Sequence, residues 1–353
     1  MSDFYSELAE QALADRPPSA EQALWILDAD NVDLLPLLHA AFKPRLRHFG
    51  RSVSIHVLNN VQNGLCPEDC GYCAQSKVSS AAIRQYKMKS DEEIFAAAET
   101  AAKGGAARYC MALSGRGPSV KRTQHLANLI KRLKAAYGME ICLSAGIMGD
   151  EQAKILGEAG LDRLNHNLNT SESHYAKITT THTWQDRVDT LAAARRNGIE
   201  TCSGLIIGMG ESSEDILEVA FKLRELDTPS IPVNFLIPIE GNPVRDDGSL
   251  TPERCLRALC LMRFINPRAE IRMAGGREGN LRGLQSLGLY PANSLFVGGY
   301  LTTRGDPFAE TYAMIEDAGF EVAGQGDDNR ARPGFQLAGS EDLLRPEVAA
   351  VTE

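Results

Sequence analysis

The chain has 353 residues, of which 43% are hydrophobic and 24% charged, and its formal net charge is −9. This composition is typical of a soluble globular protein with about one to three domains, and the negative charge argues against a nucleic-acid partner. The opening residues MSDFYSELAEQ lack the features of a secretory signal and no stretch is apolar enough to span a membrane, so we expect a cytoplasmic protein without membrane contact.

Eight short apolar runs begin near residue 52 and alternate with amphipathic helical segments. Their length, their β-branched residues and the Gly, Pro and Asn at their borders predict buried strands. The expected strands are residues 52–59, 108–114, 140–146, 163–169, 200–208, 231–239, 270–276 and 294–302.

Helix signals fill the gaps between these runs. Ser90 and Glu93 form a predicted capping box, and Thr183 and Thr251 begin two further helices. Eight strands with intervening helices over about 250 residues are typical of an α/β fold of the (β/α)8 TIM-barrel type. A doubly wound open sheet is the alternative, which is disfavoured because no dinucleotide-binding glycine fingerprint follows the first strand.

The barrel is expected to occupy residues 51–323. Residues 1–50 contain helical segments, one of them capped by Ser19, and are predicted to form an N-terminal helical extension packed on the barrel. Residues 324–353 are polar, contain Gly and Pro and show no periodicity, so we expect a disordered C-terminal tail.

Three cysteines, Cys66, Cys70 and Cys73, follow the first predicted strand directly. In a cytoplasmic chain, clustered thiols are more often metal ligands than disulfides. Iron–sulfur clusters are normally held by four thiolates, so three thiolates leave one iron open to a substrate. The alternatives are a zinc site completed by a distant fourth ligand, and uncoordinated surface thiols.

Three more cysteines lie inside the second, third and fifth predicted strands: Cys110, Cys142 and Cys202. Any one of them alone is best explained as a buried core residue. The strands of a barrel converge on one interior, however, so inward-facing thiols at similar depths can meet at a common centre. Arg272 in the seventh predicted strand is a cation that needs a buried anionic partner, and a cluster of sulfides and thiolates provides one. The last two cysteines, Cys255 and Cys260, are predicted to be structural.

Three asparagines, Asn165, Asn167 and Asn169, alternate along the end of the fourth predicted strand. Barrel active sites are built at this end of the strands, and alternate strand residues share a face. Because amides both donate and accept hydrogen bonds, we expect these residues to read polar ligands. The alternative is a cluster of turn-forming asparagines.

These motifs resemble a known family. The C-x3-C-aromatic-C spacing of Cys66, Cys70, Tyr72 and Cys73 is similar to the hallmark of the radical S-adenosylmethionine (SAM) superfamily, and the segment GLIIGMGE at 204–211 resembles a second signature of it. The segments RYCM, ICLSAG, ETCSG and IRMAGGRE resemble the biotin synthase family within that superfamily. The resemblance implies a SAM-binding [4Fe-4S] cluster on Cys66, Cys70 and Cys73. It also implies a [2Fe-2S] cluster on Cys110, Cys142, Cys202 and Arg272.

The resemblance also implies ligand-binding residues. SAM is expected to contact Tyr72, Asn167, Asn169, Arg187 and Ile206, and dethiobiotin is expected to contact Asn165, Asn167 and Asn234. The family often has Asp at position 169, so Asn169 replaces a charged ribose contact with a neutral one. For Arg187, an ion pair with Asp186 or Asp189 on the same helix is the structural alternative.

The implied reaction is the radical insertion of sulfide from the inner cluster into dethiobiotin, which forms biotin. It requires an external one-electron donor such as a flavodoxin or ferredoxin, and we further expect a homodimer. The basic residues Lys77, Arg84, Lys87 and Lys89 are a candidate surface for an acidic donor or, alternatively, a solvated loop. Other barrels of the superfamily (methylornithine synthase-like or hydrogenase-maturase-like) are the alternative enzymes, and an iron–sulfur electron carrier or scaffold is the non-enzyme alternative.

Overall fold

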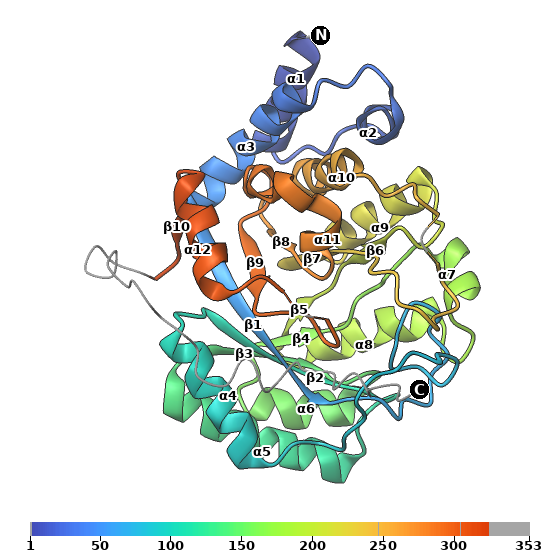
Figure 1. The fold of residues 1–353 in the computed structure, drawn as a ribbon, viewed down its shortest axis with the longest axis vertical. Helices are drawn as coiled ribbons and strands as arrows, with labels where there is room; N and C mark the ends of the chain where they lie inside the picture. Colours follow the sequence, from blue (N-terminus) through green and yellow to red (C-terminus); the bar gives the residue numbers. More distant parts are fainter. Residues whose placement is uncertain (1, 246, 304, 325–353) are drawn as a thin grey trace, which may run out of the picture.

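A closed parallel barrel forms the centre of the computed structural model (Figure 1). The structure describes residues 2–245, 247–303 and 305–324, so the predicted disordered tail lies outside the described residues apart from Gly324. Every pair of neighbouring strands is parallel, and β9 closes the ring against β1. The (β/α)8 barrel predicted from the sequence is confirmed.

The barrel strands follow the eight predicted runs in order. Their bounds are β1 (Ser52–Gln62), β2 (Arg108–Leu113), β3 (Glu140–Ser144), β4 (Arg163–Asn165), β5 (Glu200–Cys202), β6 (Leu205–Ile207), β7 (Ser230–Phe235), β8 (Glu270–Met273) and β9 (Ser294–Val297). The fifth predicted strand is split into β5 and β6, because Pro232 on the neighbouring strand has no N–H to complete the ladder at this point. A short strand that was not predicted, β10 (Glu321–Val322), pairs with the start of β1.

The connecting helices surround the barrel. They are α4 (Asp91–Lys103), α5 (Val120–Tyr137), α6 (Asp150–Glu158), α7 (Glu172–Ile178), α8 (Trp184–Arg196), α9 (Ser213–Glu225), α10 (Pro252–Ile265), α11 (Arg277–Leu281), the 3-10 helix η1 (Arg282–Leu289) and α12 (Phe308–Asp317). Ser90 and Thr183 form the predicted N-terminal caps of α4 and α8, each with a complete capping box. In the described part of the chain, no helix has the length and apolar character needed to cross a membrane.

Three helices precede the barrel: α1 (Ser2–Leu13), α2 (Ala20–Asp28) and α3 (Leu34–Phe49). They lie together beside α10, and α2 and α3 both pack against that helix (Figure 1). Ser19 caps α2 as predicted. The helical extension expected ahead of the barrel is therefore present and covers one side of it.

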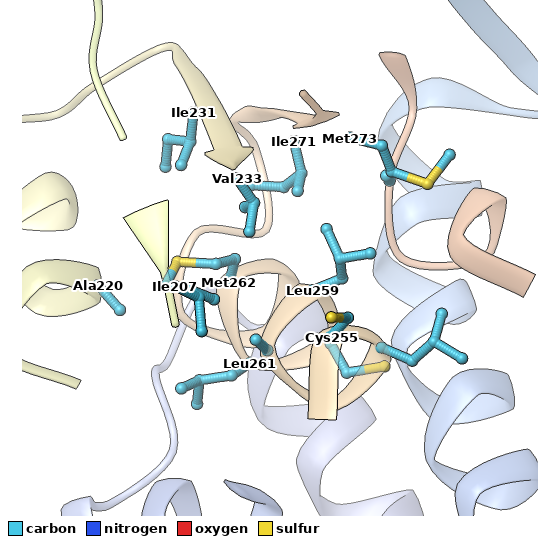
Figure 2. Packing of buried hydrophobic residues seen from close by; sticks show 14 of the residues in the cluster. Ile207, Ala220, Ile231, Val233, Cys255, Leu259, Leu261, Met262, Ile271 and Met273 are labelled. Atoms are coloured by element: carbon cyan, nitrogen blue, oxygen red, sulfur yellow. The ribbon is translucent and has the colours of Figure 1, made fainter. Parts of the chain in front are cut away.

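The barrel wall separates a hydrophobic outer layer from a polar interior. Figure 2 shows the outer layer, where α10 faces β7 and β8 through Leu259, Met262, Ile231, Val233, Ile271 and Met273. Because strand side chains alternate between the two faces, the intervening residues Asn234, Glu270 and Arg272 point into the barrel. Cys255 and Cys260 of α10 are fully buried in the outer layer.

Candidate functional site

A cavity of about 270 Å³ opens at the C-terminal ends of the barrel strands, where active sites of this fold lie. Its walls come from the loop after β1, from the ends of β4, β6 and β7, and from the loop after β9. The sequence-predicted residues that line it are Cys66, Cys70, Tyr72, Cys73, Asn165, Asn167, Asn169, Arg187, Ile206 and Asn234.

The outer cysteines lie in the loop that follows β1. Cys70 is buried, whereas Cys66 and Cys73 are half-buried. Burial raises the pKa of the Cys73 thiol to about 12, and it also raises the pKa of Cys70 against the opposing effect of Arg187. Since a coordinating thiol is deprotonated by its metal, these thiols would have to ionise in order to bind a metal centre.

The Asp69 carboxylate fixes this loop to the turn between α7 and α8. It accepts hydrogen bonds from the Thr179 hydroxyl (2.7 Å) and from the N–H groups of Thr180 (2.9 Å) and Thr181 (3.1 Å). Burial opposes ionisation, but hydrogen bonds from Thr180 and its neighbours hold the pKa of Asp69 far below its ordinary value. These hydrogen bonds therefore hold the cysteine loop against the turn between α7 and α8.

A second contact between the same segments runs through Glu68 and His182. Glu68 accepts from the Thr181 hydroxyl at 2.7 Å and lies 2.5 Å from His182 Nδ1. The other ring nitrogen of His182 meets Arg187 at 2.9 Å. Because a guanidinium only donates, His182 Nε2 accepts and its Nδ1–H donates to Glu68. Burial, followed by the charge of Arg187, lowers the pKa of His182, which is consistent with a neutral ring.

Arg187 is buried and points into the cavity. It donates to the Tyr175 hydroxyl and to the Asn167 carbonyl oxygen (2.9 Å). Among the described ion pairs none joins Arg187 to Asp186 or Asp189, so the surface ion pair considered from the sequence is not formed. The guanidinium is instead a buried cation at the edge of the cavity that holds the outer cysteines.

The three asparagines line the cavity, but not through strand alternation. β4 ends at Asn165, and Asn169 has a left-handed backbone (φ 71°), which Asn tolerates better than most residues. The predicted alternation along one strand is therefore wrong beyond Asn165. The amide of Asn169 donates to the Tyr72 hydroxyl at 2.6 Å, a bond that a carboxylate at this position is unable to donate.

The inner cysteines meet inside the barrel. Cys110 and Cys142 are paired across β2 and β3, and Cys202 lies in the same buried cluster. All three are buried, in a cluster that also contains Ala274 and Phe296. The contact with Cys110 comes first among the effects that raise the pKa of Cys142.

Arg272 faces the same thiols. Its NH1 group lies 3.6 Å from Cys202 Sγ, and its Nε has no hydrogen-bond partner among the described residues. Asn165 Nδ2 approaches Cys202 Sγ at 3.3 Å, so one side chain connects the inner thiols to the cavity. The structure thus brings together the four residues that the sequence analysis grouped as an inner ligand set.

Sequence reasoning missed two residues that contact this inner group. Glu270 pairs with Arg272, and it was detectable because it lies two residues earlier on the same strand face. Tyr300 was assigned to a strand, yet it lies in the loop after β9. Its ring packs on Phe296 (5.5 Å between centroids) and on the inner cysteine cluster, and it lines the cavity. It therefore forms part of the wall between the cavity and the inner thiols.

In the part of the chain that the structure describes, no group of three or more His, Cys, Asp or Glu side chains is arranged to hold a metal ion, and this applies to zinc and iron alike. The alternative of loose surface thiols does not fit the burial of Cys70 or the hydrogen bonds that fix its loop.

Two family models match the chain. Residues 62–223 match the model described as Radical SAM superfamily, and residues 232–321 match the Biotin and Thiamin Synthesis associated domain. The first match contains both sets of cysteines, and the second contains Asn234, Arg272 and Tyr300. The two matched segments are therefore consecutive parts of one barrel.

The chain is also similar to curated proteins over nearly its whole length. It is 58% identical to a biotin synthase of Acaryochloris marina, over 92% of this chain and 95% of the relative. It is 55% identical to a biotin synthase of Magnetococcus marinus, over 89% of this chain and 98% of the relative.

Solved structures with the same fold are more distant in sequence. A methylornithine synthase matches with a TM-score of 0.78 at 20% identity, over 96% of this chain and 100% of that one. An FeFe-hydrogenase maturase from Carboxydothermus hydrogenoformans matches with a TM-score of 0.76 at 16% identity, over 94% and 81%. At these identities the likeness shows the fold alone.

Proposed function

The chain belongs to the biotin synthase family of the radical SAM superfamily, and from that premise we propose how its two sets of cysteines share the reaction. We assign a [4Fe-4S] cluster to the outer set, Cys66, Cys70 and Cys73. We assign a [2Fe-2S] cluster to the inner set, Cys110, Cys142, Cys202 and Arg272. The observation that carries this proposal is the convergence of three thiols and a guanidinium inside the barrel, next to the cavity that the outer thiols line.

The outer set fits a cluster with one open iron. Three thiols lie in one loop, and the cavity provides the space for a ligand at the fourth iron. The buried cation of Arg187 lies close enough to Cys70 to oppose the rise in its pKa. A cation at this distance stabilises an anionic centre bound to the thiolates.

The inner set fits a metal–sulfide centre because one guanidinium nitrogen of Arg272 lacks a partner and another faces a thiol. Arg272 Nε is buried without a hydrogen bond in the described part of the chain, and NH1 contacts Cys202 Sγ. The three thiols lie in one buried cluster, and Asn165 Nδ2 approaches Cys202 Sγ at 3.3 Å. Anionic sulfurs at this position would accept hydrogen bonds from both the Arg272 guanidinium and the Asn165 amide.

SAM is assigned to the part of the cavity between the outer loop and the end of β6. Arg187 and Asn167 are held together by the hydrogen bond from the guanidinium to the Asn167 carbonyl, and Asn169 is fixed to Tyr72. Ile206 donates its N–H to the Asn169 carbonyl (2.8 Å) and adds an apolar surface. These residues would bind the carboxylate, the ribose and the adenine of SAM.

Dethiobiotin is assigned to the deeper part of the cavity, against Asn165, Asn167 and Asn234. Asn234 is oriented by two backbone contacts, since it donates to the Leu205 carbonyl (3.0 Å) and accepts from Gly275 N (3.0 Å). An amide has two donors and two lone pairs, so one of each remains for the ureido group of the substrate. Asn165 would hold the substrate beside Cys202, where the inner cluster is assigned.

When bound, the outer cluster and SAM supply a 5′-deoxyadenosyl radical that removes hydrogen from an unactivated carbon, and the inner cluster supplies the sulfur. The residues of this chain contribute position and exclusion of water. Asn165 and Asn234 orient the substrate, Arg187 and Asn169 orient SAM, and Tyr300 covers the inner thiols.

The reaction needs electrons, and the surface beside the outer loop is suited to an acidic donor such as a flavodoxin or ferredoxin. Lys77, Arg84 and Lys87 are exposed there. Lys89 is not part of this surface, because it donates to Asn59 (2.8 Å) and lies over the ring of Tyr86. We also propose a homodimer, and a cytoplasmic location in which the eight free thiols stay reduced.

The proposed function is tested by incubating the anaerobically reconstituted chain with dethiobiotin, SAM and a one-electron reductant. We expect biotin and 5′-deoxyadenosine, and we expect Cys66→Ala to form neither. A product other than biotin would favour a different reaction of the same barrel, such as that of a methylornithine synthase or a maturase. Absence of SAM cleavage in the reconstituted wild type would favour an electron carrier or scaffold.

A further inference from the structure

A buried ionic network supports Arg272 from the side opposite the thiols. Glu270 and Arg272 are two residues apart on β8 and both point into the barrel, where Arg272 NH2 donates to the Glu270 carboxylate. The side chain of Arg272 is 1% exposed and that of Glu270 is 13% exposed. In the described part of the chain, Glu270 is the only carboxylate within ion-pair distance of Arg272.

Other groups fix the orientation of the Glu270 carboxylate. Oε1 accepts from Arg108 NH1 (3.1 Å), the Ser230 hydroxyl (3.0 Å) and the Ser294 hydroxyl (3.2 Å). Arg108 and Arg272 both form ion pairs with this carboxylate, so its surroundings are cationic. The buried ring of His56 lies with its Nε2 atom 3.5 Å from the same carboxylate oxygen.

The network determines which end of Arg272 faces the thiols. NH2 is occupied by Glu270 and by the Ser230 hydroxyl (2.8 Å), and the guanidinium lies over the Phe296 ring at 5.0 Å. NH1 is therefore left to face Cys202 Sγ at 3.6 Å. Without Glu270 the guanidinium would lose both its buried counter-charge and one of the contacts that set its rotation.

We propose that Glu270 is a positioning residue that holds Arg272 with NH1 turned toward the inner thiols, and that its negative charge lowers the reduction potential of the centre held there. The inference rests on the proposed function, since it concerns the [2Fe-2S] cluster assigned to those thiols. A negative charge in a low-dielectric interior stabilises the oxidised form of a nearby cluster. Groups that orient a metal ligand from behind also slow the loss of the metal.

The test compares Glu270→Gln with Glu140→Gln in the full, anaerobically reconstituted chain. Glu140 is a matched control because it also pairs with Arg108 (2.6 Å), but it is 48% exposed and makes no ion pair with Arg272. Spectroelectrochemical titration would give the midpoint of the inner cluster, and a chelator challenge would give its rate of loss. Two further measurements, the rate of SAM cleavage without dethiobiotin and the iron content of the outer cluster, serve as controls. Both should be the same in the variants as in the wild type.

We expect Glu270→Gln to shift the inner midpoint to more positive potential and to lose the inner cluster about tenfold faster, with the outer site intact and Glu140→Gln like the wild type. The inference would be overturned if Glu270→Gln left both the midpoint potential and the rate of loss of the inner cluster unchanged. It would also be overturned if Glu140→Gln changed them as much as Glu270→Gln does. If Glu270→Gln fails to fold, Glu270→Asp takes its place in the test. This variant should keep the wild-type midpoint potential of the inner cluster but lose that cluster faster to the chelator. Loss at the wild-type rate would overturn the positioning role of Glu270. A wild type that binds only the outer cluster would instead refute the proposed function, and this inference with it.

Discussion

Gly275 gives a direct test of the wall between the cavity and the inner thiols. A Cβ at this position would lie 2.6 Å from Cδ1 and 2.8 Å from Cε1 of Tyr300. The backbone of Gly275 is not left-handed, so alanine is allowed there and its effect is steric alone. Because carbon atoms pack at about 3.5–4.0 Å, Gly275→Ala must displace the Tyr300 ring by about 1 Å.

The size of the effect follows from this displacement. The ring has little room to retreat, since Phe296 lies 5.5 Å from it between centroids and the inner cysteines pack against it. Overpacking of this kind lowers the free energy of unfolding by about 1–3 kcal/mol. A misplacement of about 1 Å beside reacting groups can reduce the rate by about 100-fold, so we expect biotin formation to fall by about 10–100-fold. SAM cleavage without substrate should remain, because the outer loop is not touched.

A double-mutant cycle with Tyr300→Ala measures the clash. Urea unfolding of the reduced apo-protein would give the four free energies of unfolding, and removing the ring should abolish the penalty of Gly275→Ala. Gly279→Ala in α11 is the control, because nothing lies within 4 Å of its Cβ and alanine should stabilise the helix by up to about 1 kcal/mol. Additivity of the two substitutions within about 0.5 kcal/mol, or a wild-type rate of biotin formation in Gly275→Ala, would refute the reasoning.

Three other predictions follow from the site and its supports. Cys142→Ala should lose the iron and sulfide of the inner cluster only, with SAM cleavage partly retained; a full iron complement would mean that the inner ligand set is wrong. Arg187→Lys should raise the KM for SAM at least about tenfold, because a lysine does not reproduce the fixed geometry of the guanidinium, and an unchanged KM would exclude it from the SAM site. Asp215 has its pKa lowered to about 2 by hydrogen bonds from Ser171 and its neighbours against the effect of burial. Because this folded-state pKa is below the unfolded one, Asp215→Asn should lower the free energy of unfolding by about 1 kcal/mol near neutral pH, and the difference should vanish as pH falls from about 4 to about 2. A difference that is constant over this range in urea titrations would contradict the assignment.

The barrel and both sets of cysteines were predictable because their signals are local. Alternating apolar runs and caps such as Ser90 depend on neighbours in the sequence, and the spacing of Cys66, Cys70 and Cys73 is visible in one short segment. The grouping of Cys110 with Cys142 needed only the barrel topology, which brings inward residues of neighbouring strands together.

The remaining features depend on contacts between distant segments. The break before β6 depends on Pro232, which lies on the neighbouring strand. The left-handed turn at Asn169 depends on its bridge to Leu205. Tyr300 covers the inner thiols only because the chain turns after β9, and its sequence alone favoured continuation of the strand.

The most direct test of the central claim, two metal centres that act on one cavity, is to follow the sulfur. The inner cluster of the wild type would be reconstituted with isotopically labelled sulfide, freed of excess sulfide, and taken through a single turnover with dethiobiotin and SAM. The assignment predicts that the biotin formed carries the label and that the inner cluster is lost in step with it. Unlabelled biotin, formed while the labelled inner cluster stays intact, would contradict the account.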